Sequence, residues 1–362
     1  MKHITCFITA LSSGGAEHQL TILADSLIER GYVVELVTFS DLSDHYLYSD
    51  KIKRIRIAKG KNQLFKLLSI FCFFLFHKTD YIISFGYRNN TLALIPLLIR
   101  PGVKIIAGER CVLYDKETIY QKLNFEFLYK RATHIVTNSF SQRQDIISKY
   151  PDCEKKCRVI TNYTDLHKYL PKFHNREGVV TIGIFCRYHP QKNYERFAKA
   201  VQMIKQQSKV PFLIKWYGNK KEHDNQNPYY AHFNQLVTEY GIENVLVLND
   251  HVKNVDELIP SFDAMCLPSL VEGFSNSISE YICCGKPVLC SDVADNGIMV
   301  HDGVNGFLFD PKDENSMVQA FQTFLSLSRE ELSKMGQESR KIAESLFDKE
   351  KFVNGYIQLI EG

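Results

Sequence analysis

The chain has 362 residues, of which 45% are hydrophobic, and a formal net charge of +3. This length predicts two domains of roughly 150 to 200 residues, each with its own core. The first residues, MKHITCFITAL, lack the apolar region and cleavage site of a signal peptide and are interpreted as a strand. The ten cysteines, among them Cys153, Cys157, Cys283 and Cys284, lack the spacing of a disulfide framework or a zinc site. The ten fit a reducing cytoplasm, we interpret these four as small buried hydrophobic residues, and we assign no metal and no cofactor.

The charge is distributed unevenly along the chain. Residues 1–175 contain 25 Lys/Arg and 16 Asp/Glu, a net +9, whereas residues 176–362 contain 19 and 25, a net −6. This asymmetry predicts that the two halves meet different partners. No finger, basic helix or ribonucleoprotein-type motif indicates nucleic acid as a partner. An anionic membrane surface and a phosphorylated acceptor both fit the basic half, and the choice stays open.

Short apolar runs alternate with helical patterns, which is typical of parallel sheets covered by helices. A strand over 4–10, a tight SSGG loop and a helix over 16–30 open the chain, and Gly31 ends the helix. Further strands are predicted over 32–39, 80–85, 103–108, 134–139 and 158–163. After a polar linker over 170–178, strands are predicted over 179–186, 212–218, 245–250, 264–269 and 287–292, and a helix over 349–362.

These elements predict an α/β chain with two Rossmann-like, doubly wound parallel-sheet domains facing across a cleft. The predicted domains span residues 1–172 and 173–345, and the helix within 346–362 is expected to pack back toward the first domain. Ligands of such sheets usually bind at the carboxyl ends of the strands.

Two cations follow the first strand of the second half. Arg187 and Lys192 stand in a loop before a helix that starts near Asn193. Cations at a strand end and a helix amino terminus form an anion site, which here would hold a diphosphate. The alternative is a pair of solvated surface charges.

A second loop, EGFSNSISEYICCG, supplies two carboxylates. Glu272 lies in the loop, and Glu280 lies inside a short helix that Ser275, Asn276 or Ser277 can cap. The position of Glu280 suits hydrogen bonds from a diol such as a ribose, and Glu272 would lie nearer the group beyond the phosphates. Alternatively, the two are a surface-loop charge and a helix-face charge. The chain contains no D-x-D pair to hold a divalent cation, so Lys, Arg and helix termini would neutralise a departing diphosphate.

The segments SSGGAE, CRYHPQKN, LPSLVEGFSNSISEYICCGKPVLCSD and DGVNGFLF together resemble the retaining glycosyltransferases of family four, which have the GT-B fold. The resemblance spans nearly the whole chain, and its E-x7-E segment is the most specific part. It implies a nucleotide-sugar donor, most often a UDP-sugar, bound mainly by the second domain. It also implies an acceptor bound by the first domain and retention of the anomeric configuration.

The resemblance also implies roles for single residues. Arg187 and Lys192 match the diphosphate-binding pair, Glu280 the ribose-binding glutamate, and Glu272 the carboxylate beside the donor sugar. The loop that touches sugar and phosphate through its backbone matches Phe274, Ser275, Asn276 and Ser277. Gly15 matches the amino-half loop that closes over the donor, and Val252, within His251-Val252-Lys253, falls where the family contacts the base.

The chain departs from the family on the acceptor side. Many relatives carry a histidine after a strand like VKIIAG, but this sequence continues GERCVLY. Either the role passes to Glu109 or Arg110, or it is absent.

Residues 64–76, LFKLLSIFCFFLF, form an apolar run that is shorter than the roughly 20 residues needed to span a bilayer. Basic residues surround the run: Lys51, Lys53, Arg54, Arg56, Lys59, Lys61, Lys66, His77 and Lys78. The segment is either an amphipathic element at a membrane interface or an ordinary helix buried against the first sheet. The first alternative suits a lipid-linked acceptor at the inner face of the cell membrane, as in bacterial O-antigen, lipopolysaccharide or capsule assembly.

The sequence therefore favours a metal-independent, retaining transferase that moves a hexose or N-acetylhexosamine to a glycan acceptor. Arg187 and Lys192 would stabilise the leaving diphosphate, and Glu272 would act electrostatically rather than as a nucleophile. The alternatives are a nucleotide-sugar 2-epimerase of the same fold and a non-catalytic membrane-associated adaptor. A nicotinamide oxidoreductase is disfavoured because SSGGAE lacks the G-x-G-x-x-G spacing.

Overall fold

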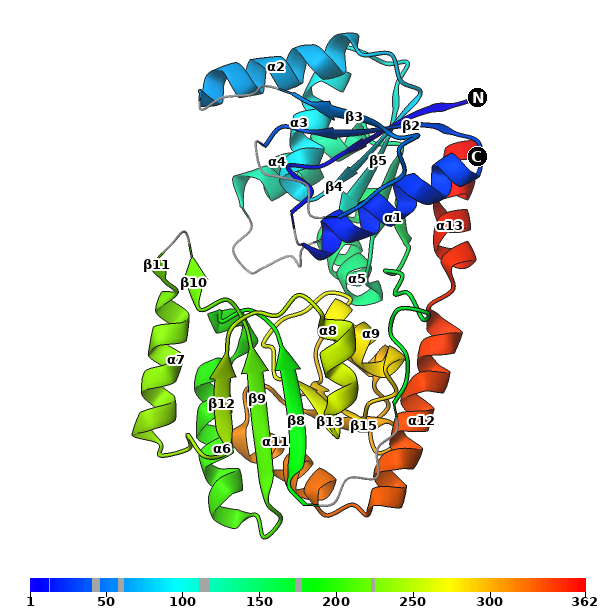
Figure 1. Ribbon diagram of the computed structural model, residues 1–362. Helices are drawn as coiled ribbons and strands as arrows, with labels where there is room; N and C mark the ends of the chain where they lie inside the picture. The colour runs from blue at the N-terminus through cyan, green and yellow to red at the C-terminus, as the bar shows by residue number, and fades with distance from the viewer. Residues whose placement is uncertain (13, 41–45, 58–61, 111–117, 173–177, 223–224) are drawn as a thin grey trace. The chain divides into compact units, whose positions relative to one another are not determined.

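The computed structural model describes residues 1–362 except 13, 41–45, 58–61, 111–117, 173–177 and 223–224 (Figure 1). The chain divides into two units, Met1–Tyr163 together with Lys349–Gly362, and the continuous stretch Thr164–Asp348. The first division thus falls after Tyr163 rather than after residue 172. Most of the predicted linker lies outside the described residues.

The first unit is built on a seven-stranded sheet in which all strand pairs are parallel. The strand order is β3-β2-β1-β4-β5-β6-β7, so its direction reverses between β1 and β4, as in a doubly wound sheet. The strands are β1 (His3–Phe7), β2 (Val33–Thr38), β3 (Lys53–Arg56), β4 (Tyr81–Phe85), β5 (Lys104–Glu109), β6 (His134–Thr137) and β7 (Cys157–Val159).

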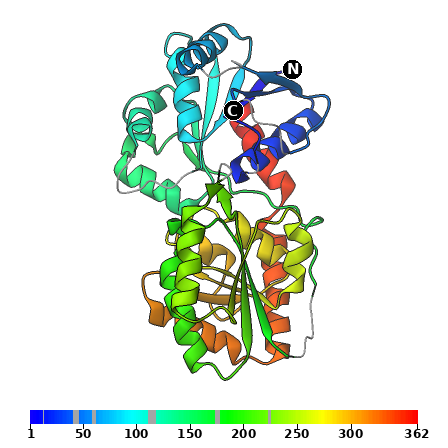
Figure 2. The ribbon, with the colours of Figure 1, turned by 60° about the vertical axis from the view of Figure 1, so that its left-hand side comes forward.

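Side chains on the two faces of this sheet belong to two separate hydrophobic cores, because successive residues of a strand point to opposite faces. One core joins Ile4 and Cys6 of β1 to α1 (Gly15–Glu29) and α13 (Lys349–Glu361). The last helix, in red, accordingly lies beside α1, in blue (Figures 1 and 2). The other core packs under the remaining helices: α2 (Gln63–Phe76), α3 (Tyr87–Leu97), α4 (Ile119–Glu126), η1 (Leu128–Lys130), α5 (Phe140–Lys149) and η2 (Pro151–Cys153).

The helix α2 is an unusual covering helix. Only Ile70 and Phe74 of its 14 residues are buried, although its sequence is almost entirely apolar. The run at 64–76 is therefore a helix packed on the first unit, with a solvent-facing side that is also apolar. No helix in the described part of the chain has both the length and the hydropathy needed to cross a bilayer.

The second unit contains a six-stranded parallel sheet in the order β12-β9-β8-β13-β14-β15, which reverses between β8 and β13. Its strands are β8 (Val180–Phe185), β9 (Phe212–Tyr217), β12 (Leu246–Asn249), β13 (Ala264–Leu267), β14 (Val288–Ser291) and β15 (Gly306–Phe309). A small antiparallel pair, β10 (Lys221–Glu222) and β11 (Asn225–Gln226), lies outside the main sheet.

The core of this second unit is centred on Trp216 and packs under three helices, α6 (Tyr194–Gln207), α7 (Pro228–Glu239) and α11 (Glu314–Leu325). The other helical segments are η3 (Pro190–Lys192), α8 (Val255–Leu258), η4 (Ile259–Ser261), α9 (Asn276–Cys283), α10 (Asn296–Met299) and α12 (Arg329–Leu346). The cysteines at 153, 157, 283 and 284 are all buried, which confirms that they pack as small apolar residues.

The structure confirms the predicted fold class and adds four strands that were not predicted, the β10–β11 pair and one strand in each main sheet. The strand β3 has the sequence KRIR and lies at the edge of its sheet, where charged residues are tolerated. The strand β15 begins at Gly306, where a Cβ atom would lie 1.9 Å from the carbonyl oxygen of Val288. Only glycine permits this close approach, which is why the NGFL segment pairs with β14.

Candidate active site

The candidate site lies at the carboxyl end of the second sheet, on both sides of the switch point between β8 and β13. Arg187 and Lys192 follow β8, and Glu272 follows β13. The two strands are parallel neighbours, with Ala264 opposite Ile182. Their carboxyl ends therefore meet at the edge where doubly wound sheets bind ligands.

Lys192 and Glu272 form an ion pair across this switch point. The Nζ atom of Lys192 lies 2.5 Å from Oε1 of Glu272, and the two side chains are only 14% and 11% exposed. The backbones of their loops are joined as well, since Gln191 Nε2 donates to the Val271 carbonyl at 2.9 Å and Leu270 N donates to the Gln191 carbonyl at 2.9 Å. These contacts hold the Lys192 cation and the Glu272 carboxylate next to each other at the edge of the sheet.

Arg187 supplies a second cation at this edge. It is exposed, and among the described residues it forms no hydrogen bond or ion pair. Burial raises the pKa of the neighbouring Cys186 thiol to about 12, while the charges of Lys192 and Arg187 lower it and that of Glu272 raises it. The charges of Arg187, Lys192 and Glu272 thus all act on the Cys186 thiol at the carboxyl end of β8.

The start of α9 is anchored at the same point. Ser275 caps the helix by accepting a hydrogen bond from Ile278 N, and Ser277 Oγ donates to the Phe185 carbonyl at 3.1 Å. Phe185 N in turn donates to the Tyr281 hydroxyl at 2.9 Å. The N–H groups of Gly273 and Ser277 have no acceptor among the described residues. Unpaired N–H groups at a helix amino terminus favour an anion.

Glu280 lies one turn further along α9 and has different neighbours. Its partly buried carboxylate accepts a hydrogen bond from the Tyr169 hydroxyl. The charge of Lys168 lowers the pKa of this carboxylate, and the charge of Asp256 raises it. Burial raises the pKa of Glu280 to about 7, although the Tyr169 hydrogen bond opposes this shift. The structure therefore does not bring Glu280 into contact with the Lys192–Glu272 pair. Glu280 instead provides a carboxylate of raised pKa on α9, the helix that follows the Glu272 loop.

The remaining predicted donor residues occupy the same end of the second sheet. Val252 is partly buried in the loop after β12, where Asp250 Oδ1 accepts hydrogen bonds from the backbone of Lys220 and His251. Phe274 is buried and packs edge-on against Phe347. Asn276 is the first residue of α9.

The predicted site residues of the first unit are Gly15, Glu109 and Arg110. Gly15 is the first residue of α1. Glu109 is fully buried at the end of β5, where it accepts hydrogen bonds from Tyr129 and Asn90, and burial raises its pKa to about 7. Glu109 thus has no solvent-facing surface to offer an acceptor, because the fold encloses it.

Arg110 binds elements of its own unit. Its guanidinium donates to Asn162 Oδ1 at 3.0 Å and to the Tyr356 hydroxyl at 2.5 Å, and it lies 3.9 Å from the Phe85 ring centroid. Arg110 therefore ties α13 to the sheet in this conformation.

One group of side chains in the first unit has the chemistry of a metal site, although the sequence led us to assign none. The ligand atoms of His3, Glu35 and His77 all lie within 4.8 Å of one another. Glu35 is already paired with Lys53 Nζ at 2.9 Å and His77 Nε2 at 2.5 Å. Burial acts to raise the pKa of Glu35, but hydrogen bonds from Lys53 and His77 outweigh it and lower the pKa below its ordinary value. Both carboxylate oxygens of Glu35 therefore already have a partner, Oε1 in Lys53 and Oε2 in His77.

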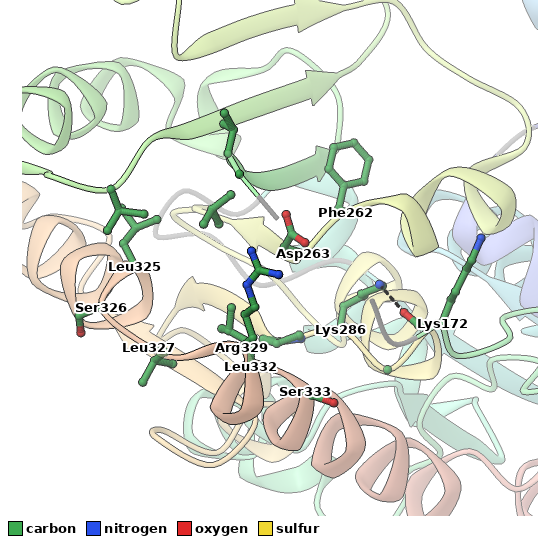
Figure 3. Close-up of a pocket in the computed structure, with 16 residues that line it drawn as sticks. Lys172, Phe262, Asp263, Lys286, Leu325, Ser326, Leu327, Arg329, Leu332 and Ser333 are labelled. Carbon is green, nitrogen blue, oxygen red and sulfur yellow. Dashed lines mark hydrogen bonds between the residues drawn. The ribbon is translucent and has the colours of Figure 1, made fainter. Parts of the chain in front are cut away.

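A separate cavity of about 330 Å³ opens at the amino-terminal edge of the second sheet, beside Val180 and Pro287 (Figure 3). Lys286 borders it, and its Nζ donates to the carbonyls of Lys172 and Pro260 at 2.7 and 2.9 Å. This cavity contains none of the predicted site residues and lies at the opposite edge of the sheet from them.

The sequence did not single out Gln191, Tyr169 or Tyr281, which fix the site. Gln191 lies beside Lys192 and Tyr281 beside Glu280, so adjacency to a predicted residue was the only available signal. Their partners are 80, 111 and 96 residues away along the chain. Contacts of this kind follow from the sheet order and not from local spacing.

Two doubly wound units in tandem, the second with a cationic switch point, define the GT-B class of glycosyltransferases. The chain belongs to the glycosyltransferases, because two family models of such enzymes together match residues 13–342. The family model "Glycosyltransferase Family 4" matches residues 13–168, and the model "Glycosyl transferases group 1" matches residues 167–342.

Individual relatives are distant but extend over most of the chain. A Campylobacter jejuni N-acetylgalactosamine-N,N'-diacetylbacillosaminyl-diphospho-undecaprenol 4-alpha-N-acetylgalactosaminyltransferase is 23% identical, with 100% of both chains covered. An Escherichia coli UDP-Gal:alpha-D-GlcNAc-diphosphoundecaprenol alpha-1,3-galactosyltransferase is 24% identical over 74% of this chain and 70% of its own. The solved structure of Anabaena HepE in complex with UDP is 18% identical, with a TM-score of 0.82 and 99% of both chains covered.

Proposed function

We propose that this glycosyltransferase moves a hexose or N-acetylhexosamine from a UDP-sugar to a lipid-linked glycan, with retention and without a divalent metal. The observation that carries the proposal is the Lys192–Glu272 ion pair at the switch point, at the same sheet edge as the exposed Arg187. It supports the proposal because a diphosphate and its sugar bound at this edge would meet cationic donors and a carboxylate.

The charge balance of the site supports a diphosphate ligand. Without ligand, Glu272 neutralises Lys192, whereas Arg187 has no such partner among the described residues. A bound diphosphate would offer oxygens to both cations and to the N–H groups at the start of α9. Lys192 would then share its donors between the diphosphate and Glu272, which would remain beside the sugar.

In the proposed reaction, the bond between the anomeric carbon and the diphosphate oxygen breaks, and its electron pair leaves with the diphosphate. Arg187, Lys192 and the α9 amino terminus stabilise that growing negative charge. The carboxylate of Glu272 stabilises the positive charge at the anomeric carbon. The acceptor hydroxyl forms the new C–O bond on the same face and passes its proton to the departing phosphate oxygen.

The donor and acceptor classes are inferred from relatives. The Campylobacter and Escherichia enzymes are named for diphospho-undecaprenol acceptors, the Escherichia enzyme is named for UDP-Gal, and HepE is described with UDP. Undecaprenol-linked glycans are therefore the acceptors to test first, with UDP-hexoses and UDP-N-acetylhexosamines as donors.

The test begins with a thermal-shift comparison of UDP, GDP and ADP sugars, because a ligand that binds only the folded state raises its melting temperature. The preferred donor is then incubated with diphospho-undecaprenol glycans, and NMR of the product reports the anomeric configuration. An α-linked product from an α-linked donor supports the proposal. Donor incubated alone should remain unchanged, and its conversion to a free sugar isomer would indicate an epimerase instead.

A further inference from the structure

The first unit concentrates exposed apolar side chains on neighbouring helices. Twelve of the twenty exposed large hydrophobic residues in the described chain fall between Leu64 and Phe127. They lie on α2, at the carboxyl end of α3 and on or just after α4. Because α2 packs on α3 and α3 on α4, these residues belong to one group of adjoining helices (Figure 1).

The exposed side of α2 is a continuous apolar stripe. Phe65, Leu68, Cys72 and Phe76 are all exposed, and their spacings of three and four residues place them on one helix face. The buried residues Ile70 and Phe74 occupy the other side. A surface helix normally turns polar residues to water, so this arrangement is the reverse of the usual one.

The stripe continues onto the end of α3. Arg100 donates to the Phe74 carbonyl at 2.8 Å, which holds that end of α3 against the carboxyl half of α2. Leu98 and Ile99, just before Arg100, are 56% and 69% exposed. We call Phe65, Leu68, Phe76, Leu98 and Ile99 the α2–α3 apolar surface.

The segments that contain this surface carry mostly positive charge. Residues 62–110 and 118–131 contain nine Lys/Arg and three Asp/Glu; of these, Glu109 is fully buried and Arg110 contacts Asn162 and Tyr356. Lys78, next to the end of α2, is exposed, as are Lys51 and Arg56 before it. Lys59 and Lys61 lie outside the described residues. An apolar stripe edged by cations complements an anionic bilayer, whose headgroups attract Lys and Arg while its interface accepts apolar side chains.

We propose that the α2–α3 apolar surface docks the first unit on an anionic phospholipid bilayer. The inference rests on the proposed function in one respect, that a lipid-linked acceptor would be met at such a bilayer. The helix would lie in the interface, since it has only 14 residues. Phe65, Leu68 and Phe76 would enter the acyl boundary, and the flanking cations would face the headgroups.

Vesicle co-sedimentation of the full chain tests the proposal. The wild type should bind vesicles of phosphatidylglycerol and phosphatidylcholine, bind phosphatidylcholine alone weakly, and release at high salt. The variant Phe65→Ser/Leu68→Ser/Phe76→Ser should lower the partition coefficient at least about 100-fold, since each substitution removes a large apolar side chain from the interface. Phe140→Ser/Val304→Ser, which changes two exposed apolar residues elsewhere, should bind like the wild type.

UDP binding, oligomeric state and sugar transfer are measured on the same proteins. UDP binding by the triple variant should match the wild type, which shows that the second unit is intact. Equal vesicle binding by the wild type and the triple variant would overturn the proposal, and so would a wild-type dimer that the triple substitution dissociates without any vesicle binding. Vesicle binding without sugar transfer would uphold the docking surface and count only against the proposed function.

Discussion

Lys192 and Glu272, 80 positions apart in the chain, form an ion pair 2.5 Å long between loops that follow neighbouring strands. This contact is the structural core of the candidate site. It joins the carboxylate that would face the sugar to a cation that would face the diphosphate.

Removing either partner should abolish most of the transfer activity. Lys192→Ala and Glu272→Ala are each expected to lower kcat by about 100- to 1,000-fold, the usual effect of deleting one preorganised electrostatic group. Lys199→Ala is a matched control, because Lys199 lies on α6 in a looser, more exposed pair with Glu314 at 3.7 Å. Steady-state kinetics on all three proteins, with circular dichroism to verify folding, decides the matter. Wild-type turnover in either site variant would refute the assignment.

Asn193 should prove important for holding Lys192 in place. It is buried in the left-handed conformation, with φ of 59°, and its side chain donates to the Pro311 carbonyl at 2.7 Å. Asn193→Gly keeps the conformation and loses the hydrogen bond, so we expect a loss of about 1–3 kcal/mol in the free energy of unfolding. Asn193→Ala should lose about 1–2 kcal/mol more from backbone strain. Denaturant unfolding gives both values, and equal stability of the two variants would contradict the role of the backbone.

Donor affinity should depend on pH through Glu280. The pKa of this carboxyl is about 7 because burial disfavours its charge, whereas a ribose diol donates hydrogen bonds best to the ionised form. UDP should therefore bind about tenfold more weakly at about pH 6 than at about pH 8. Calorimetry across this range measures the effect. Glu280→Gln, which cannot ionise, corrects for protonation of UDP itself, and an equally steep pH profile in that variant would exclude Glu280 as the cause.

The same carboxyl should affect stability with the opposite dependence on pH. Its pKa is higher in the folded than in the unfolded chain, so its contribution is fully present below the unfolded value and is lost as the pH rises through about 7. Glu280→Gln should thus gain stability relative to the wild type at alkaline pH. Thermal denaturation at matched pH values compares the two proteins, and a gain confined to acid pH would contradict this prediction.

Sugar transfer should persist without divalent cations. The cations and helix terminus of the site are expected to neutralise the diphosphate, so excess EDTA should change the rate by less than about twofold. Readdition of Mg²⁺ or Mn²⁺ after chelation is the control. A loss of activity that either ion restores would show that the proposed charge balance is incomplete.

Much of the site's framework could be predicted from the sequence. The apolar runs that became β8 and β13 were visible, and the charged loops after them indicated where Arg187, Lys192 and Glu272 would lie. Parallel neighbours bring such loops together, so the fold class alone predicts that the residues after β8 and β13 share one edge.

Other features depended on tertiary contacts that spacing does not encode. Glu109 is enclosed by Tyr129 and Asn90 from two other elements, and nothing near it in the sequence signals this burial. Tyr169 reaches Glu280 over a long separation for the same reason. Hydropathy also gave no way to know that α2 would bury only Ile70 and Phe74, because its apolar residues surround the whole helix.

The position of α13 has a consequence for the order in which the chain matures on the ribosome. Phe352, Val353, Tyr356 and Ile360 belong to the same core as β1 and α1, so the half that is translated first lacks part of its interior until α13 has been synthesised. The continuous stretch Thr164–Asp348 needs no such contribution and is free to fold earlier. The portion that is made first is therefore expected to complete its core last.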